Sequence, residues 1–250
     1  MADSIVLDGV TLNKNSREGA WKVTGIEGWW DSAKAQAADV ERPNNDGSMP
    51  GVITYEPRQI RISGRVIAKS HNYIHEAMQM LAALSFRSFS NLTVAGHGAT
   101  QTASVRIDGN VSFNIRSDKY LQFEIPLIAL DPFKYGERRY KSVAAGASDT
   151  VFHRGTVEAW PSVTVLGSMP DGYTVSIGGQ SVSVPMGIPS GVTHTIDYRR
   201  RRLYINGELF MGAFGSQKFR SIPPGLRTNV SLSAPSGSGS AGVTVYDTYI

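Results

Sequence analysis

Two histidines, His71 and His75, together with the adjacent Glu76, most resemble a metal-binding motif in this sequence. Imidazoles four residues apart can share one face of a helix and bind zinc there. The order His-x-x-x-His-Glu matches neither the His-Glu-x-x-His motif of zinc proteases nor its inverted form, and no third ligand is apparent. We therefore predict a solvated first helical turn at this position, and no metal-binding residues in the chain.

A second candidate is the run of four arginines, Arg199 to Arg202, between Tyr198 and Tyr204. Arginines interleaved with tyrosines can hold phosphates or stack on bases. The run falls between two segments with strand patterns, where an exposed hairpin tip would keep every guanidinium in water. We predict an exposed turn, and an acidic neighbour and a nucleic acid stay open as its alternative roles.

The remaining motifs are typical of turns rather than of catalysis. Aspartate followed by glycine, as in Asp108-Gly109 and Asp171-Gly172, is ordinary turn chemistry. Gly96-His97-Gly98 lacks a following helix with the Lys-Ser/Thr of a phosphate cradle, and no Gly-x-Ser-x-Gly elbow occurs. The absence of cysteine excludes a thiolate nucleophile and a cysteine-based zinc site. We expect no catalytic and no cofactor-binding residues, no cofactor, and a protein that is not an enzyme.

Three tryptophans, Trp29, Trp30 and Trp160, are candidates for stacking on a sugar. The aromatic face packs well against the apolar side of a pyranose ring. Aromatic side chains are more often anchors of a core or of a protein interface. Both interpretations stay open from the sequence.

Composition restricts the class of protein. With 41% hydrophobic and 18% charged residues in 250, the chain is globular and can fill a core. The net charge of only +4 is scattered apart from the arginine run, which disfavours a dedicated nucleic-acid binder. No apolar run approaches 18 residues and no charged leader precedes one, so we expect a soluble, unprocessed protein without membrane insertion.

Period-2 patterns predict strands in both halves, and one helix lies in the first half. Residues 59–66 place Ile60, Ile62 and Val66 on one face and Arg61 and Arg65 on the other. Apolar residues at helical spacing predict a helix over about 72–85, which should lie across a sheet. The other strands expected in the first half are 5–7, 21–25, 103–107 and 121–127.

The second half has about seven short strands separated by turn signals, which favours an antiparallel sandwich. Asn206-Gly207 is typical of a type I′ hairpin turn, and the glycine-serine segment 236–242 of a flexible connection. The strands expected there are 163–166, 173–177, 182–184, 193–198, 203–205, 229–232 and 243–246.

Two irregular segments divide this pattern. The strand 121–127 should end near Pro132, which lacks a backbone donor, and residues 141–156 are rich in Ala, Ser and Gly. We therefore predict an N-terminal domain over 1–140, a linker over 141–156 and a C-terminal domain over 157–250. Residues 30–55 show no sustained period, and loops this long are usually functional or ordered by a partner.

Several sequence pieces in a fixed order carry a family resemblance. The pieces are Gly28-Trp-Trp30, Arg42-Pro43, Asp46-Gly47, the strand Arg58-Gln-Ile-Arg-Ile-Ser-Gly-Arg-Val66, the helix from about Asn72, Asp131-Pro-Phe-Lys-Tyr-Gly136, Thr195-Ile-Asp197, Leu203-Tyr-Ile-Asn-Gly207 and Pro224-Gly-Leu-Arg-Thr-Asn-Val230. Together they resemble the distal tail proteins of long-tailed siphophages, over nearly the whole chain.

This resemblance implies a mainly β protein, with a ring-forming α+β N-terminal domain and a galectin-like C-terminal sandwich. It implies a structural virion protein, a homo-hexameric ring at the end of the tail tube, located in the phage tail tip and assembled in the host cytoplasm. The implied partners are the tail tube protein, the tape-measure protein, a tail-tip protein such as a fibre or lysin hub, and viral DNA in transit. Extensions like residues 30–55 would help to build the contacts between subunits.

The alternative function is a carbohydrate-binding module that recognises host cell-wall glycan. True galectins carry a His-x-Asn-x-Arg and a downstream Trp-x-x-Glu constellation. The C-terminal half offers only His194 and Trp160, without those spacings. Fold analogy alone does not establish a sugar site, and the arginine run Arg199 to Arg202 receives no role from the resemblance.

Overall fold

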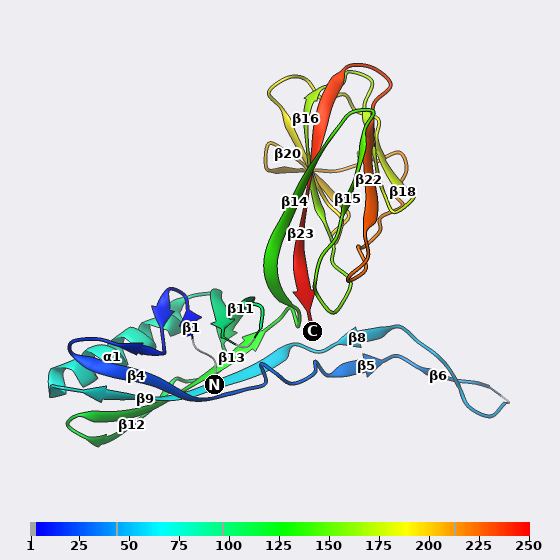
Figure 1. Ribbon diagram of the computed structural model, residues 1–250. Coiled ribbons are helices and arrows are strands. Elements are labelled where there is room, and N and C mark those ends of the chain that lie inside the picture. The colour runs from blue at the N-terminus through cyan, green and yellow to red at the C-terminus, as the bar shows by residue number, and fades with distance from the viewer. Residues whose placement is uncertain (1–3, 44, 97, 213) are drawn as a thin grey trace. The chain divides into compact units, whose positions relative to one another are not determined.

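The computed structural model describes residues 4–43, 45–96, 98–212 and 214–250 (Figure 1). The chain divides into two compact units, Met1–Lys134 with Ile250 (unit 1) and Tyr135–Tyr249 (unit 2). Both consist mainly of antiparallel strands, and among the described residues α1 is the one α-helix. The mainly β fold with a single helix is thus confirmed.

Unit 1 contains two antiparallel sheets that enclose a core. One has the order β3-β4-β9-β13-β12, and the other the order β2-β1-β10-β11, with the end of β11 also pairing with β13. The elements are β1 (Ser4–Leu7), β2 (Val10–Thr11), β3 (Lys14–Asn15), β4 (Gly19–Glu27), β9 (Arg58–Ala68), α1 (His71–Ala83), the 3-10 turn η1 (Leu84–Phe86), β10 (Ser90–Ala95), β11 (Gln101–Ile107), β12 (Ser112–Ser117) and β13 (Tyr120–Ala129).

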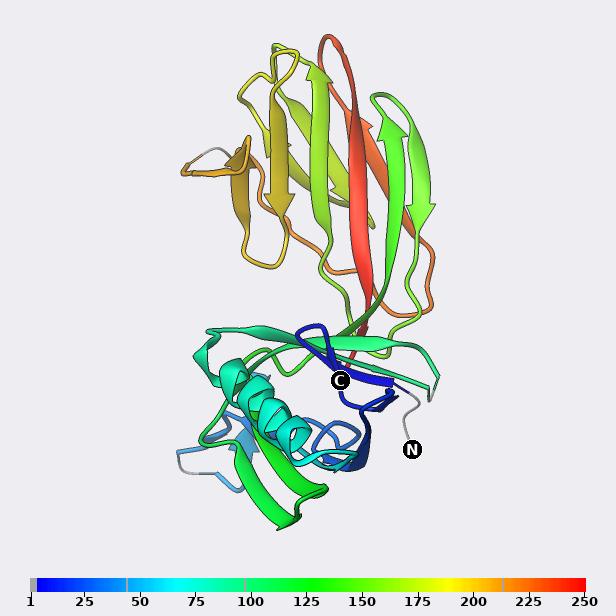
Figure 2. The same cartoon turned by 90° about the vertical axis from the view of Figure 1, so that its left-hand side faces the viewer.

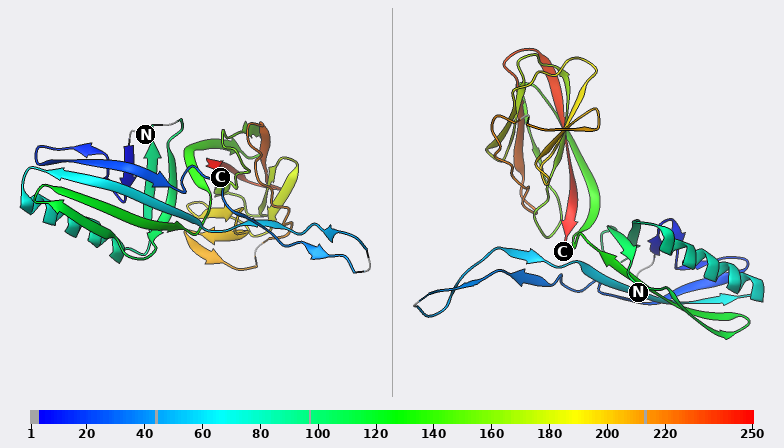
Figure 3. Two further views of the ribbon diagram at one scale, coloured as in Figure 1. Left: turned by 90° about the horizontal axis from the view of Figure 1, so that it is seen from below. Right: turned by 180° about the vertical axis from the view of Figure 1, so that it is seen from behind.

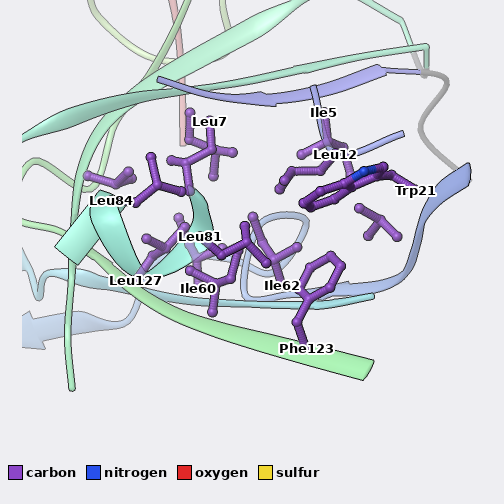
Figure 4. Close-up of a cluster of buried hydrophobic side chains, with 14 of the residues drawn as sticks. Ile5, Leu7, Leu12, Trp21, Ile60, Ile62, Leu81, Leu84, Phe123 and Leu127 are labelled. Atoms are coloured by element: carbon purple, nitrogen blue, oxygen red, sulfur yellow. The ribbon is translucent and has the colours of Figure 1, made fainter. Parts of the chain in front are cut away.

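The alternation expected in β9 holds along its length. Ile60, Ile62 and Val66 are buried, whereas Gln59 and Arg61 face solvent. The helix begins at His71 after the N-cap Ser70, whose hydroxyl accepts from the Tyr73 N–H at 3.4 Å. The helix, seen from the side in Figure 2, packs against β9 through its buried stripe, and side chains of the resulting core are drawn in Figure 4. The stripe consists of Ile74, Ala77 and Leu81.

Residues 35–43 and 45–55, which we name the arm, form a two-stranded ribbon between β4 and β9 (Figure 3). β5 (Ala35–Ala37) pairs with β8 (Ile53–Tyr55), and β6 (Val40–Glu41) pairs with β7 (Ser48–Met49), both antiparallel. The expectation of an irregular loop over 30–55 was therefore wrong. Because the arm's strands pair only with each other and bury neither face, nothing imposes the period-2 hydrophobicity by which strands are recognised.

Unit 2 is an antiparallel sandwich, as predicted, with every expected strand present. One sheet has the order β21-β20-β19-β16-β23-β14 and the other β15-β22-β17-β18, around a separate core. The strands are β14 (Lys134–Ala144), β15 (Ser148–Val151), β16 (Ser162–Ser168), β17 (Tyr173–Ile177), β18 (Gln180–Val184), β19 (Thr193–Asp197), β20 (Arg202–Ile205), β21 (Glu208–Phe210), β22 (Thr228–Ser233) and β23 (Ser238–Tyr249).

Two expected connections are strands instead. In the predicted linker 141–156, β14 continues to Ala144 and β15 pairs with β22. β15 is an edge strand, and edge positions accept the small and polar residues that had indicated a linker. In the glycine-serine segment 236–242, residues 238–242 form the first part of β23. A Cβ on Gly239 would lie 2.5 Å from the Leu166 carbonyl oxygen, so this glycine allows close packing rather than flexibility.

A buried carboxylate holds the chain together near both ends of unit 2. Asp247 on β23 accepts two hydrogen bonds from Arg139 on β14, at 2.7 and 2.9 Å, and one from the Arg154 backbone N–H at 2.7 Å. These bonds lower the pKa of Asp247, although its burial acts in the opposite direction. This ion pair thereby links β14 and β23, the first and last strands of unit 2.

Candidate assembly interface

The arm exposes apolar side chains that its own chain leaves uncovered. Val52 is 75% exposed, Ile53 61% and Val40 59%, and Met49 and Tyr55 are also exposed. A two-stranded ribbon is at best marginally stable alone in water, because it has no second layer on which to bury a face. Val40 lies opposite Met49 in the ribbon, and neighbouring exposed apolar residues of this kind are typical of interaction surfaces.

The base of the arm is fixed by a buried arginine. The guanidinium of Arg58 donates from Nη1 to the carbonyl oxygens of Gly28 at 2.8 Å and Asp31 at 2.7 Å. Its Nε donates to the carbonyl oxygen of Pro132 at 3.2 Å. Arg58 is only 4% exposed, and its burial lowers its pKa while the charge of Asp31 raises it. One side chain, placed just after the arm, therefore joins residues 28–31, which precede the arm, to the segment that follows β13.

A second buried cation supports the same turn. Lys134 donates from Nζ to the carbonyl oxygen of Trp29 at 2.9 Å and lies 5.6 Å from the centroid of its ring. Burial, with a further contribution from the charge of Arg58, lowers the pKa of Lys134 to about 8. We name Arg58, Lys134 and residues 28–31 the joint. Both of its cations bind backbone carbonyls, which orients the backbone of the turn.

The turn itself requires glycine. Gly28 has φ +75°, and a Cβ there would lie 1.9 Å from the carbonyl oxygen of Gln59. Its N–H donates to Asp31 Oδ2 at 3.1 Å, which closes the turn. The joint thus brings together sequence pieces on which the family resemblance rested, Gly28-Trp-Trp30, Arg58 and Asp131-Pro-Phe-Lys-Tyr-Gly136. Their separation along the sequence hid this contact.

The tryptophans have different environments. Trp29 is fully buried in the unit 1 core, so it is a core residue and not a stacking platform. Trp30 is 48% exposed next to the arm. Trp160 is 38% exposed in unit 2. His194, the other residue considered for a sugar site, is 1% exposed and lies 3.1 Å from the Tyr173 hydroxyl, where burial lowers its pKa.

The histidine pair and the arginine run lie where the sequence placed them. His71 and His75 are exposed on the first turns of α1 with their Nε2 atoms 2.9 Å apart, and Asp118 lies 3.7 Å from His71 Nδ1. Arg199 to Arg201 lie in the exposed turn between β19 and β20, and the exposed Arg202 begins β20. Arg200 pairs with Asp197 at 3.0 Å. The exposed-turn interpretation is confirmed.

The remaining motif residues lie in turns. Gly109 and Gly172 have positive φ, and Asp171 accepts a hydrogen bond from the Ser236 hydroxyl. His97 of Gly96-His97-Gly98 lies outside the described residues. Within the described ranges, no three His, Asp or Glu side chains gather in a way that would hold a metal ion. A search of the same residues for helices long and apolar enough to cross a membrane finds none.

Comparison with known proteins gives a match in fold only. No protein-family model and no curated protein matches the sequence. The crystal structure of Dit from phage SPP1 matches with a TM-score of 0.75 at 15% identity, covering 99% of both chains. Its authors describe it as a paradigm of the hub adsorption apparatus in phages that infect Gram-positive bacteria.

Two structures of the phage P2 baseplate in its activated conformation, with calcium and with strontium, match less closely. Each has a TM-score of 0.50 and 8% identity. They cover 94% and 96% of this chain, and 92% and 97% of the matched chains. The chain therefore has the fold of these proteins over essentially its full length.

Proposed function

We propose that this protein is a distal tail protein of a bacteriophage, a non-enzymatic structural subunit of the virion. Six copies form a closed ring at the end of the tail tube, and the ring connects the tube to the tail-tip or receptor-binding machinery. DNA passes through its lumen. The full-length likeness to the SPP1 Dit protein supports this proposal at the level of fold.

The observation in this chain that carries the proposal is the arm. A ring requires one heterologous interface that is repeated until it closes, so each subunit needs two different complementary surfaces. The arm supplies one such surface, because it presents Val40, Val52 and Ile53 to solvent on a ribbon without a second layer. The joint holds its base, which reduces the conformational freedom that association would otherwise have to remove.

Absolute mass by light scattering behind a sizing column tests assembly directly. We expect a hexamer of the 27.1 kDa chain, or a concentration-dependent approach to one. The double variant V52E/I53E should give a monomer, since two charges on the arm cannot be buried in an interface without a partner. The matched control is F86E, because Phe86 is 92% exposed on η1, outside the arm. A hexamer that persists in V52E/I53E, or that is lost equally in F86E, would refute the role of the arm.

The proposed partners follow from the position at the tube end. They are the tail tube protein, the tape-measure protein and a tail-tip protein such as a fibre or lysin hub, with assembly in the host cytoplasm. Unit 2 would act as a galectin-like module of the particle. Co-expression with the tube protein of the same phage, followed by affinity capture and electron microscopy, should give rings capping tubes.

Carbohydrate binding by unit 2 keeps one of its two supporting residues, Trp160, whose side chain is partly exposed. His194 no longer contributes, because it is buried against Tyr173. A screen of host cell-wall glycans with the wild-type protein and Trp160→Ala tests this second function independently of assembly. Binding that disappears in Trp160→Ala would establish it alongside the ring.

A further inference from the structure

Unit 2 ends one of its sheets with an open edge strand. β21 (Glu208–Phe210) pairs only with β20 and is the terminal strand of its sheet (Figure 2). Its three residues are exposed, and the next residue, Met211, is 79% exposed. Soluble proteins usually block such edges with charged side chains, proline, a bulge or a very short strand, because an open edge can pair with another strand. β21 is short and carries Glu208 beside its turn, but Leu209, Phe210 and Met211 at its other end are neither charged nor proline.

The backbone of this edge is arranged for pairing. Asn206-Gly207 forms the predicted two-residue turn with positive φ at both positions, so Ile205 and Glu208 are the hydrogen-bonded pair that closes the hairpin. Antiparallel ladders alternate, and Tyr204 and Leu209 are then a non-hydrogen-bonded pair. The N–H and C=O groups of Leu209 therefore point away from β20, toward the open side.

The side chains at this edge combine apolar surface with positive charge. The register pairs Leu203 with Phe210 and Asp197 with Arg202, so the arginine turn lies at the Met211 end of β21. Among the described residues, no carboxylate lies within 4.0 Å of Arg201 or Arg202, and both are exposed. Leu209 and Met211 are exposed beside them.

We propose that the β21 edge and the arginine turn bind an extended acidic segment of a partner protein by strand addition. The outward backbone groups of Leu209 give hydrogen bonds to an added strand, and Leu209 and Met211 contact its apolar residues. Arg201 and Arg202 select acidic side chains at one end. This inference goes beyond the proposed ring and does not depend on it. It gives the arginine run a role, the recognition of acidic side chains of a partner protein.

Fluorescence anisotropy with the full-length protein tests the inference. The probes are two short labelled peptides, one alternating valine with glutamate and one alternating valine with lysine. We expect the acidic peptide to bind and the basic one to fail, and R201E/R202E to weaken binding by at least about ten-fold. Leu209→Pro should weaken it similarly, because it removes an outward donor without breaking a bond to β20.

Two further variants make the test specific. Lys218→Glu is the matched charge control, since Lys218 is exposed and its backbone bonds to Ser181 in the other sheet of unit 2. Leu209→Lys provides a second block of the edge if proline lowers the melting temperature. The arm variant V52E/I53E should bind the acidic peptide normally, so a failure of ring assembly is distinguishable from a failure of this site.

Several results would overturn the proposal. These are no binding of the acidic peptide, an equal loss in Lys218→Glu, or unchanged binding in both Leu209 variants and in R201E/R202E. Sedimentation with anionic phospholipid vesicles that is lost in R201E/R202E, without peptide binding, would assign the surface to lipid. A change of oligomeric mass in Leu209→Lys would assign the edge to a second copy of this chain.

Discussion

Replacement of Lys134 by methionine should change how the stability of unit 1 depends on pH. Lys134 is 4% exposed, and its pKa is lowered to about 8 from 10.5, chiefly by burial. Each pKa unit corresponds to about 1.4 kcal/mol, so the buried ammonium costs the folded state about 3 kcal/mol at neutral pH. Methionine has a similar length and no charge, and it removes this cost together with the hydrogen bond to Trp29.

The sign of the effect follows from proton linkage. Between pH 8 and pH 10.5 the unfolded chain binds more protons at Lys134 than the folded chain does, so the free energy of unfolding rises with pH. From pH 7 to pH 9.5 the wild type should gain about 2 kcal/mol relative to Lys134→Met, which cannot titrate at this position. Other groups that titrate in the same way in both proteins contribute equally to the two free energies of unfolding, so they do not affect the difference.

Urea unfolding followed by tryptophan fluorescence measures this difference. A Trp160→Phe background restricts the signal to unit 1, since Trp21, Trp29 and Trp30 all lie there. The stability difference at pH 7 alone is not decisive, because the variant also leaves the Trp29 carbonyl unpaired at a cost of about 1 to 3 kcal/mol. A difference that stays constant from pH 7 to pH 9.5 would refute the assignment of a buried, charged Lys134.

Two further substitutions, followed by urea unfolding, test the glycine turn at Gly28 and the buried carboxylate of Asp247. Gly28→Ala should destabilise unit 1 by about 2 to 4 kcal/mol, because its Cβ meets the Gln59 carbonyl, whereas Gly47→Ala, at φ +84° in open space, should cost about 1 kcal/mol. Equal losses would exclude the steric explanation. Asp247→Asn should destabilise unit 2 by about 2 to 3 kcal/mol, reduced from the value for a fully buried pair because Arg139 is partly exposed. Because the pKa of Asp247 is lowered, the wild type should lose this contribution to stability as the pH falls below the pKa of an ordinary carboxyl group. If acid lowers the stability of the wild type no more than that of Asp247→Asn, the assignment is wrong.

The sequence predicts those helices and strands whose apolar residues recur with the period of that structure. β9 and α1 were identified because each buries one face, and the Asn206-Gly207 turn because its backbone geometry favours those two residues. The arm was missed because it buries neither face. β15 was missed because an edge strand accepts the composition of a linker.

The joint could not be predicted, because its bonds end on backbone carbonyls. Arg58 and Lys134 bind the carbonyl oxygens of residues 28, 29, 31 and 132, and carbonyls carry no sequence signal. Two indications were available: Arg58 falls on the same face of its strand as the buried Ile60, and Lys134 follows shortly after Pro132. Such contacts link segments separated by up to 105 residues, and spacing within one segment does not reveal them.

The composition of the joint is itself an argument for the function of the arm. Among the described residues no carboxylate forms an ion pair within 4.0 Å with Arg58 or Lys134, although the charge of Asp31 acts on Arg58. Such cations are a costly way to fix a turn, and apolar residues of similar size would often be at least as stabilising. Proteins accept such local costs mainly where a geometry must be maintained. The geometry maintained here is that of residues 28–31, which lead from β4 into the exposed apolar arm. If the proposed ring forms through the arm, Lys134→Met should weaken its assembly even at pH values where the substitution does not lower the stability of unit 1. Light scattering of the two proteins side by side measures this.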